Sequence, residues 1–207
     1  RLLEAGADID VANEKGTTAV IAAVKSGRRE VLSMLIERGA DPEQKDNKDT
    51  SPLWYAVREG DEGSVDILLK AGADPNEEGP FGNTLLIDAV VHNEIEIARL
   101  LLESGADPGL NSADTGLTPL KYAVTLGHPE ITKELYEARL KSAMGDGRNG
   151  ENTNLVKPGE LLYTAAGEGN LETVKVLLDL GISPDTPFHD KTALMAASLA
   201  GRYEIAE

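Results

Sequence analysis

The chain has 207 residues, of which 36 are acidic and 20 are basic, so its formal net charge at pH 7 is −16. This excess of acids argues against binding to nucleic acid or to an anionic membrane surface, because both require clustered Lys and Arg. It favours solubility and a basic partner. The absence of cysteine excludes disulfides, thiolate metal sites and cysteine catalysis.

The sequence also lacks signals that would direct it to a membrane or to secretion. It has no apolar run near the roughly 18–20 residues of a membrane helix, no opening signal-peptide pattern and no Asn-x-Ser/Thr acceptor. We therefore predict an intracellular protein, either cytoplasmic or nuclear.

A short phrase, Gly-Ala-Asp, recurs every 33 residues, and such a period is the sequence signature of a repeat architecture. Its glycines are Gly6, Gly39, Gly72 and Gly105. A second series of alanines has the same phase and consists of Ala23, Ala56, Ala89 and Ala123. We expect each repeat to be one small structural unit that buries its apolar face only by stacking on its neighbours.

Each repeat contains signals for two helices. Before each alanine of the second series stands a residue suited to the N-cap of a helix: Thr18, Ser51, Thr84 and Thr118. About nine residues later the first helix should end at a residue that tolerates the left-handed conformation: Gly27, Gly60, Asn93 or Gly127. A second apolar helical segment follows, and the Gly of Gly-Ala-Asp ends it. A polar, turn-rich loop then leads to the next repeat.

The 33-residue period is interrupted once, after Ala123. The next matching alanine is Ala165, 42 residues on instead of 33. The extra residues lie near 139–158, where basic residues outnumber acidic ones four to two, and we expect the preceding helix to extend by about a turn. The insertion is either a tolerated surface loop, since added loop length costs little, or a docking or regulatory loop, since long loops are uncommon.

A 33-residue period with Thr-Pro-Leu-x-x-Ala opening one helix and Leu-Leu-x-x-Gly-Ala-Asp closing the next resembles the ankyrin repeat. The resemblance implies an all-α helical repeat solenoid of helix-turn-helix units with protruding β-hairpin-like loops, forming a single domain over residues 1–207. The family's usual His after Thr-Pro-Leu is absent, and its six positions hold Ile21, Trp54, Ile87, Lys121, Tyr163 and Met195. The expected repeats are approximately 1–12 (partial), 13–45, 46–78, 79–112, 113–157 with the insertion, 158–186, and 187–207 (partial).

Signals for chemistry are weak. Residues 145–150 fit Gly-x-Gly-x-x-Gly, but a dinucleotide site needs this motif between a strand and a helix, and here it follows a helix. The histidines His92, His128 and His189 fall in different repeats without a second ligand at helical spacing, so no transition-metal site is expected. We predict no cofactor, no metal, no catalytic residue and no enzymatic activity.

The family resemblance implies a concave binding surface formed by loop tips and first helices. It maps this surface onto Lys15, Lys25, Asn47 and Lys48 among other positions. The middle of the array holds the aromatic, Arg and apolar anchors that interfaces favour. The predicted partner-binding residues are Arg58, Glu59, Phe81, Asn83, Val91, His92, Leu117, Thr125 and Leu126. Phe81 is either such an anchor or a cap on a neighbouring helix. Trp54 and Tyr55 are interpreted as core residues.

The function most consistent with these features is a protein-interaction scaffold, monomeric in isolation, that binds a protein or peptide. The chain opens and closes within repeats, so we expect it to be a fragment of a longer protein. The alternative is therefore an ankyrin arm of a larger multidomain protein, such as an NTPase, a channel or an enzyme, that acts in intramolecular regulation or ligand sensing.

Overall fold

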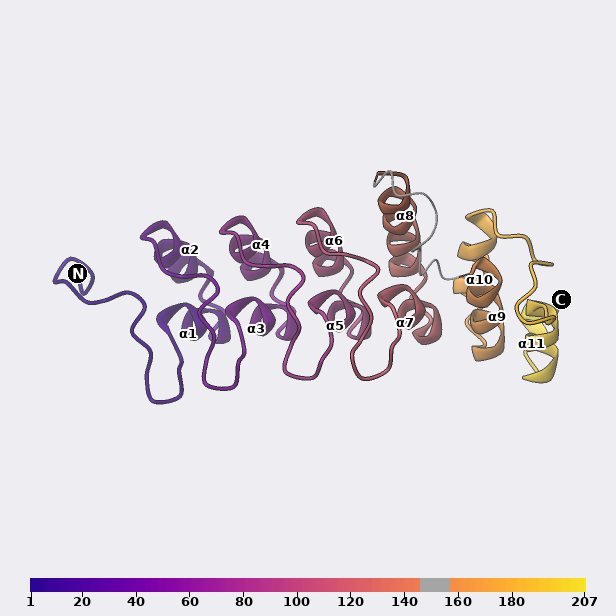
Figure 1. Cartoon of the computed structure of the whole chain (residues 1–207), viewed down its shortest axis with the longest axis horizontal. Helices are drawn as coiled ribbons and strands as arrows, with labels where there is room; N and C mark the ends of the chain where they lie inside the picture. The colour runs from indigo at the N-terminus through magenta and orange to yellow at the C-terminus, as the bar shows by residue number, and fades with distance from the viewer. Residues whose placement is uncertain (146–156) are drawn as a thin grey trace. The chain divides into compact units, whose positions relative to one another are not determined.

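The computed structural model of the chain describes residues 1–145 and 157–207, in which helices are the main regular elements (Figure 1). The central part of the predicted insertion, residues 146–156, lies outside the described residues. Short helices alternate along the chain as first and second members of successive pairs. These are α1 (Ala19–Lys25), α2 (Arg29–Glu37), α3 (Pro52–Arg58), α4 (Glu62–Lys70), α5 (Leu85–Val91), α6 (Ile95–Glu103), α7 (Pro119–Leu126), α8 (Pro129–Gly145), α9 (Pro158–Glu168), α10 (Leu171–Asp179), α11 (Ala193–Leu199) and α12 (Tyr203–Ala206).

The first helix of a pair begins where the sequence predicted. The hydroxyl of Thr18 accepts a hydrogen bond from the backbone N–H of Ile21, and Ser51 does the same for Trp54. Thr84 and Thr118 make the equivalent bonds to the N–H groups three residues on. Each hydroxyl therefore satisfies one of the N–H groups that a helix start leaves without a partner.

The Gly-Ala-Asp turns end the second helices and also organise the loops. In the second copy, the N–H of Ala40 bonds to Leu35 O, and Ala40 itself is buried. The carboxylate of Asp41 then accepts the N–H of Glu43 at 2.8 Å, and Asp74 and Asp107 repeat this bond two residues ahead. The phrase thus caps a helix and turns the chain, as the sequence indicated.

The chain divides into two compact units. The first contains residues 1–89 and 96–106, and the second contains residues 90–95 and 107–207. In the first unit α1 packs on α3 and α2 on α4, so first and second helices form two layers. In the second unit α7 packs on α9, α9 on α11, and α8 on α10.

Each unit has its own apolar core. In the first unit Leu32, Leu53 and Leu68 are fully buried, and in the second Leu135 and Leu177 are. The cores are built from Leu, Ile, Val and Ala, with small Ala56 and Ala123 fully buried on first helices. These residues recur at the positions that the repeat pattern predicts for the core.

Helix α8 is longer than the other second helices. It has 17 residues, against nine in α10, so it continues for about two further turns. The structure has the expected extension of this helix, but the helix runs to Gly145, further than the single turn expected.

Candidate functional site

A row of aromatic side chains lies on the surface of the first unit, on α3 and the loop that follows α4. Leu53, Ala56 and Val57 face the core, so the side chains of Trp54 and Tyr55 occupy the other face of α3. The two rings meet edge to face with centroids 5.3 Å apart. Both residues are half-buried, so each contributes to the packing of the first unit, as expected, and also to its surface.

The third ring of the row is Phe81, which comes from the next repeat. Its centroid lies 6.3 Å from that of Trp54, yet 64% of the residue stays exposed. The turn beneath it is closed by hydrogen bonds from Gly79 N to Asn83 O and from Gly82 N to Gly79 O. Phe81 therefore contacts a neighbouring repeat and also presents a large apolar surface to solvent.

Two cations lie over this row. The guanidinium carbon of Arg58 is 5.3 Å from the Trp54 ring, and Lys25 Nζ is 4.1 Å from the centre of the Tyr55 ring. Such contacts attract because the face of an aromatic ring carries partial negative charge. Side chains from α1, α3 and the loop at Phe81 thus form one patch, the aromatic–cation row: Lys25, Trp54, Tyr55, Arg58 and Phe81.

A hydrogen bond to Asp46 holds the Tyr55 side chain in place. Its hydroxyl donates to Asp46 Oδ2 at 2.7 Å, and the same carboxylate accepts the N–H groups of Lys48 and Thr50. Burial and this hydrogen bond raise the pKa of Tyr55. Burial alone would raise the pKa of Asp46, but the hydrogen bonds it accepts outweigh burial and lower it. Asp46 is therefore an ionised anchor that already accepts three hydrogen bonds.

Neighbouring loop tips are also tied together. The Asn47 side-chain amide donates to Glu14 O at 2.9 Å, and the Asn47 N–H donates to Lys15 O at 3.1 Å. These bonds join two repeats although the family's His is missing from both. They hold the loop tips in register beside the aromatic–cation row.

The nine predicted binding residues fall in both units. In the first, Arg58 and Phe81 belong to the aromatic–cation row, Glu59 is exposed at the end of α3, and Asn83 is half-buried. Its amide approaches Asp88 Oδ1 at 3.4 Å. The structure therefore brings together two of the four, Arg58 and Phe81, around Trp54.

The other five predicted residues lie in the second unit. Val91 and His92 are exposed at the end of α5, and Thr125 and Leu126 are exposed at the end of α7. Leu117 is half-buried and, with Thr125, lines a cavity of about 230 Å³. An ion pair between Lys121 Nζ and Glu160 Oε1, 2.8 Å apart, also borders it.

The surface that Trp54 and Tyr55 contribute was not predicted from the sequence. The signal that would have found them is the spacing within α3, because Leu53, Ala56 and Val57 already fill its buried face. A second aromatic pair occurs in the second unit, where the rings of Tyr163 and Phe188 lie 5.7 Å apart. Tyr163 stands two residues before Ala165, as Trp54 stands two residues before Ala56.

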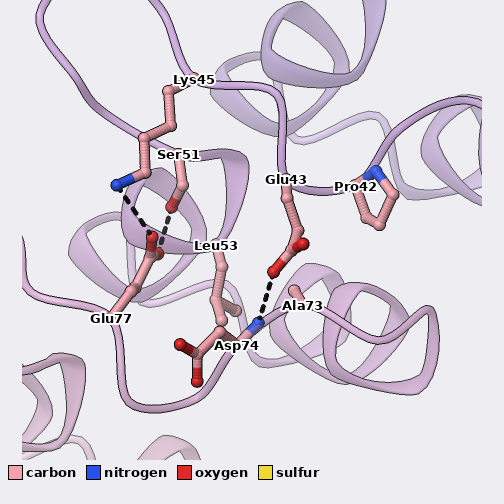
Figure 2. A pocket seen from close by; sticks show the side chains of 8 residues that line it. All are labelled: Pro42, Glu43, Lys45, Ser51, Leu53, Ala73, Asp74 and Glu77. Carbon is pink, nitrogen blue, oxygen red and sulfur yellow. Dashed lines mark hydrogen bonds and ion pairs between the residues drawn. The ribbon is translucent and has the colours of Figure 1, made fainter.

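A pocket of about 210 Å³ in the first unit contains polar groups that bind one another (Figure 2). Glu77 accepts a hydrogen bond from the Ser51 hydroxyl and lies 3.9 Å from Lys45 Nζ. Glu43 accepts the N–H of Asp74 at 3.1 Å. Burial raises the pKa of Glu77. The pocket therefore joins two loops and leaves no convergent set of free groups.

Within residues 1–145 and 157–207, no cluster of three or more His, Asp or Glu side chains could hold a metal ion. His128 Nε2 is buried without a hydrogen-bond partner, and burial lowers the pKa of this imidazole. None of the described helices is long and apolar enough to cross a membrane.

Sequence and structure comparisons agree on one family. Two family models match the chain: "Ankyrin repeats (3 copies)" over residues 1–79 and 71–144, and "Ankyrin repeats (many copies)" over residues 162–207. No curated protein sequence matches it significantly.

Two solved structures are similar over most of the chain. The human ASB11 ankyrin repeat domain is 28% identical with a TM-score of 0.66, and the match covers 92% of this chain and 81% of that one. The ankyrin repeat domain of Bcl-3, described as a unique member of the IkappaB protein family, is 25% identical with a TM-score of 0.72. That match covers 95% of this chain and 84% of the other.

Proposed function

Because the chain belongs to the ankyrin repeat family, we propose that it is a protein-interaction scaffold that binds a protein or peptide partner through loop tips and first helices. The observation that supports this best is the aromatic–cation row. Its rings come from two consecutive repeats, and Arg58 and Lys25 stack on them. Interfaces concentrate their binding energy on such Trp, Tyr and Arg side chains.

The row is also well suited to binding because it is already ordered. Tyr55 is held by Asp46, and Phe81 stands on a turn closed by two backbone hydrogen bonds. A partner would therefore pay little for fixing these side chains on association. The net charge of −16 favours a basic partner, because long-range attraction steers the encounter. We expect the chain to act as a monomer.

The test removes the two exposed anchors and keeps the fold. We expect the double variant R58A/F81A to keep wild-type helical content and melting temperature but to lose proteins that the immobilised wild-type chain retains. Each anchor should contribute about tenfold or more to affinity. The variant V31A/R38A is the matched control, since it also removes an Arg and an apolar side chain, both exposed, but at α2.

Mass spectrometry of the captured proteins compares the three chains. Retention of the same partners by wild type and R58A/F81A would show that the row is not the binding surface. Equal loss in R58A/F81A and V31A/R38A would show that the effect does not depend on this surface.

A further inference from the structure

A cavity of about 370 Å³ adjoins the aromatic–cation row in the first unit. Two consecutive loop tips and the end of α1 form it. Lys15, Lys48 and Lys25 contribute its three cations, and Tyr55 and Asp46 form part of its wall. Its size lies within the range of pockets that hold small ligands or single side chains.

The cavity carries more positive than negative charge, although Asp46 attracts Lys25. Among the ion pairs of the described residues, none involves Lys15, Lys25 or Lys48. Of the two acids that line the cavity, Asp46 already accepts three hydrogen bonds, from Tyr55, Lys48 and Thr50. Glu14, the other, is exposed. The cavity therefore contains three lysines and two carboxylates, and one of these carboxylates, Asp46, is bound to the Tyr55 hydroxyl.

Hydrogen bonds hold the loop backbone that carries Lys15 and Lys48. Asn47 ties its own loop tip to the preceding one through Glu14 O and Lys15 O, and Asp46 binds the N–H of Lys48. Lys25 is held over the Tyr55 ring. An anion entering the cavity would therefore meet an ordered loop backbone, which removes one part of the entropic cost of binding.

We propose that this cavity seats an acidic side chain of the partner, next to an apolar side chain that packs on Trp54 and Phe81. The proposal rests on the proposed function and names the chemistry of the segment that binds: an extended peptide in which Asp or Glu flanks an apolar residue. Lys25 and Tyr55 belong to both the cavity and the row, so the two parts of the site are continuous. The whole-chain charge of −16 governs the long-range encounter, whereas the cavity contacts only the segment bound in it.

The experiment uses the single tryptophan of the chain, Trp54, as its reporter. Three pools of tryptophan-free octapeptides share a central Phe, and the residues around it are Glu, Lys or Ser. Each pool is titrated into the full chain while Trp54 fluorescence is followed, and calorimetry gives the dissociation constant independently. We expect the Glu pool to bind at least about tenfold more tightly than the Lys pool at low salt. This preference should shrink as salt screens the charges.

Two triple variants with the same net charge test whether the preference comes from the three lysines of the cavity or from the overall charge of the chain. We expect K15Q/K25Q/K48Q to lose the preference for the Glu pool, and K133Q/K157Q/K191Q, which removes three exposed lysines of the second unit, to keep it. The proposal is overturned if wild type shows no such preference, if the cavity variant keeps it, or if both variants lose it equally.

The outcome also separates this inference from the proposed function. If the pools show no acidic preference but R58A/F81A still loses captured partners, only the inference on acidic segments fails. If that capture is unaffected as well, the scaffold surface itself is wrong.

Discussion

The indole of Trp54 is held by packing and by the cation–π contact with Arg58. Its Nε1 is buried and makes no hydrogen bond, which costs free energy in a folded protein. Around it lie Tyr55, Phe81 and Arg58, and its N–H edge faces Gly79. The large ring of Trp54 is the surface that Phe81 and Arg58 contact. The unsatisfied Nε1–H group is the free-energy cost of placing the ring there.

This arrangement predicts that Gly79→Ala disturbs the aromatic–cation row. A Cβ on Gly79 would overlap Trp54 Nε1, so the indole has to move. We expect a loss of about 1–3 kcal/mol in the free energy of unfolding and a shifted Trp54 emission maximum. Gly167→Ala in α9 is the control, because the new Cβ would meet only the Cβ of Ala196 in α11, at an ordinary contact distance of 3.7 Å. Unchanged emission and stability in Gly79→Ala would contradict the packing described for Trp54.

A second residue-level prediction concerns Glu77. Burial raises the pKa of this carboxyl in the folded state, so its protonated form favours folding and that contribution is lost as pH rises through the folded pKa. At pH 7 the buried carboxylate is therefore a cost, and Lys45 at 3.9 Å offsets little of it. We expect Glu77→Gln, which keeps an acceptor for Ser51, to raise the free energy of unfolding at pH 7.

The difference in the free energy of unfolding between Glu77→Gln and wild type should shrink as the pH falls towards the ordinary pKa of Glu. Glu77 is then protonated in the wild-type chain and, like Gln, carries no charge. Urea unfolding of both chains between pH 4 and pH 7 measures it. A Glu77→Gln variant less stable than wild type at pH 7 would show that the ion pair with Lys45 outweighs burial.

At the scale of elements, Asp61 joins two helices. It is the N-cap of α4, where it accepts the N–H and the hydroxyl of Ser64. It also pairs with Arg29 at the start of α2, whose Nε and Nη2 lie 2.6 Å from Oδ1. One carboxylate thus caps one helix and ties it to the second helix of the preceding repeat.

We expect Asp61→Asn to lower the free energy of unfolding at pH 7 by about 1–2 kcal/mol, because Asn still caps the helix but loses the charge-assisted bonds with Arg29. Burial alone would raise the pKa of Asp61, but its bonds from Ser64 and Arg29 lower it. This stability is present above the unfolded pKa and is lost as pH falls through the folded pKa.

The difference between wild type and Asp61→Asn should therefore disappear in acid, opposite in sign to the effect at Glu77. Asp66→Asn is the control, since Asp66 is more exposed and pairs only with Lys70 within the same helix. An equal loss in both variants would argue against a special role for Asp61.

The sequence predicted most of the helices because their signals are local. Thr18, Ser51 and Gly39 act through bonds within four residues of themselves, and a 33-residue period repeats them. Contacts between repeats have no such local signal. The pairing of Phe81 with Trp54, or of Arg29 with Asp61, depends on which side chains the stacking brings together, and only the structure shows it.

The sequence predicted only part of the candidate site, because contacts between repeats have no local signal. Arg58 and Phe81 were identified from their residue type and their position in the repeat. Trp54 was assigned to the core from its spacing within the helix, whereas the fully buried positions of α3 include Leu53, Ala56 and Val57. The extension of α8 was anticipated from its helix-forming residues, but its length was not, because no glycine ends the pattern before Gly145.

At the scale of the whole molecule, stability should be distributed over the two units. Each unit has fully buried leucines of its own, and helix pairs in such arrays pack mainly on their nearest neighbours. A change in the core of one unit should then be felt most strongly by the helices that pack on it.

Two matched substitutions test this distribution. Leu68 on α4 and Leu177 on α10 are both fully buried on second helices, and replacing either by Ala should cost about 2–5 kcal/mol. Hydrogen exchange followed by mass spectrometry would locate the loss. We expect Leu68→Ala to reduce protection mainly in α2, α3 and α4, and Leu177→Ala mainly in α8, α9 and α10, since these helices pack on one another. Equal loss of protection throughout the chain in both variants would instead mean that the array unfolds as one cooperative body, in which a defect is shared at once by every repeat.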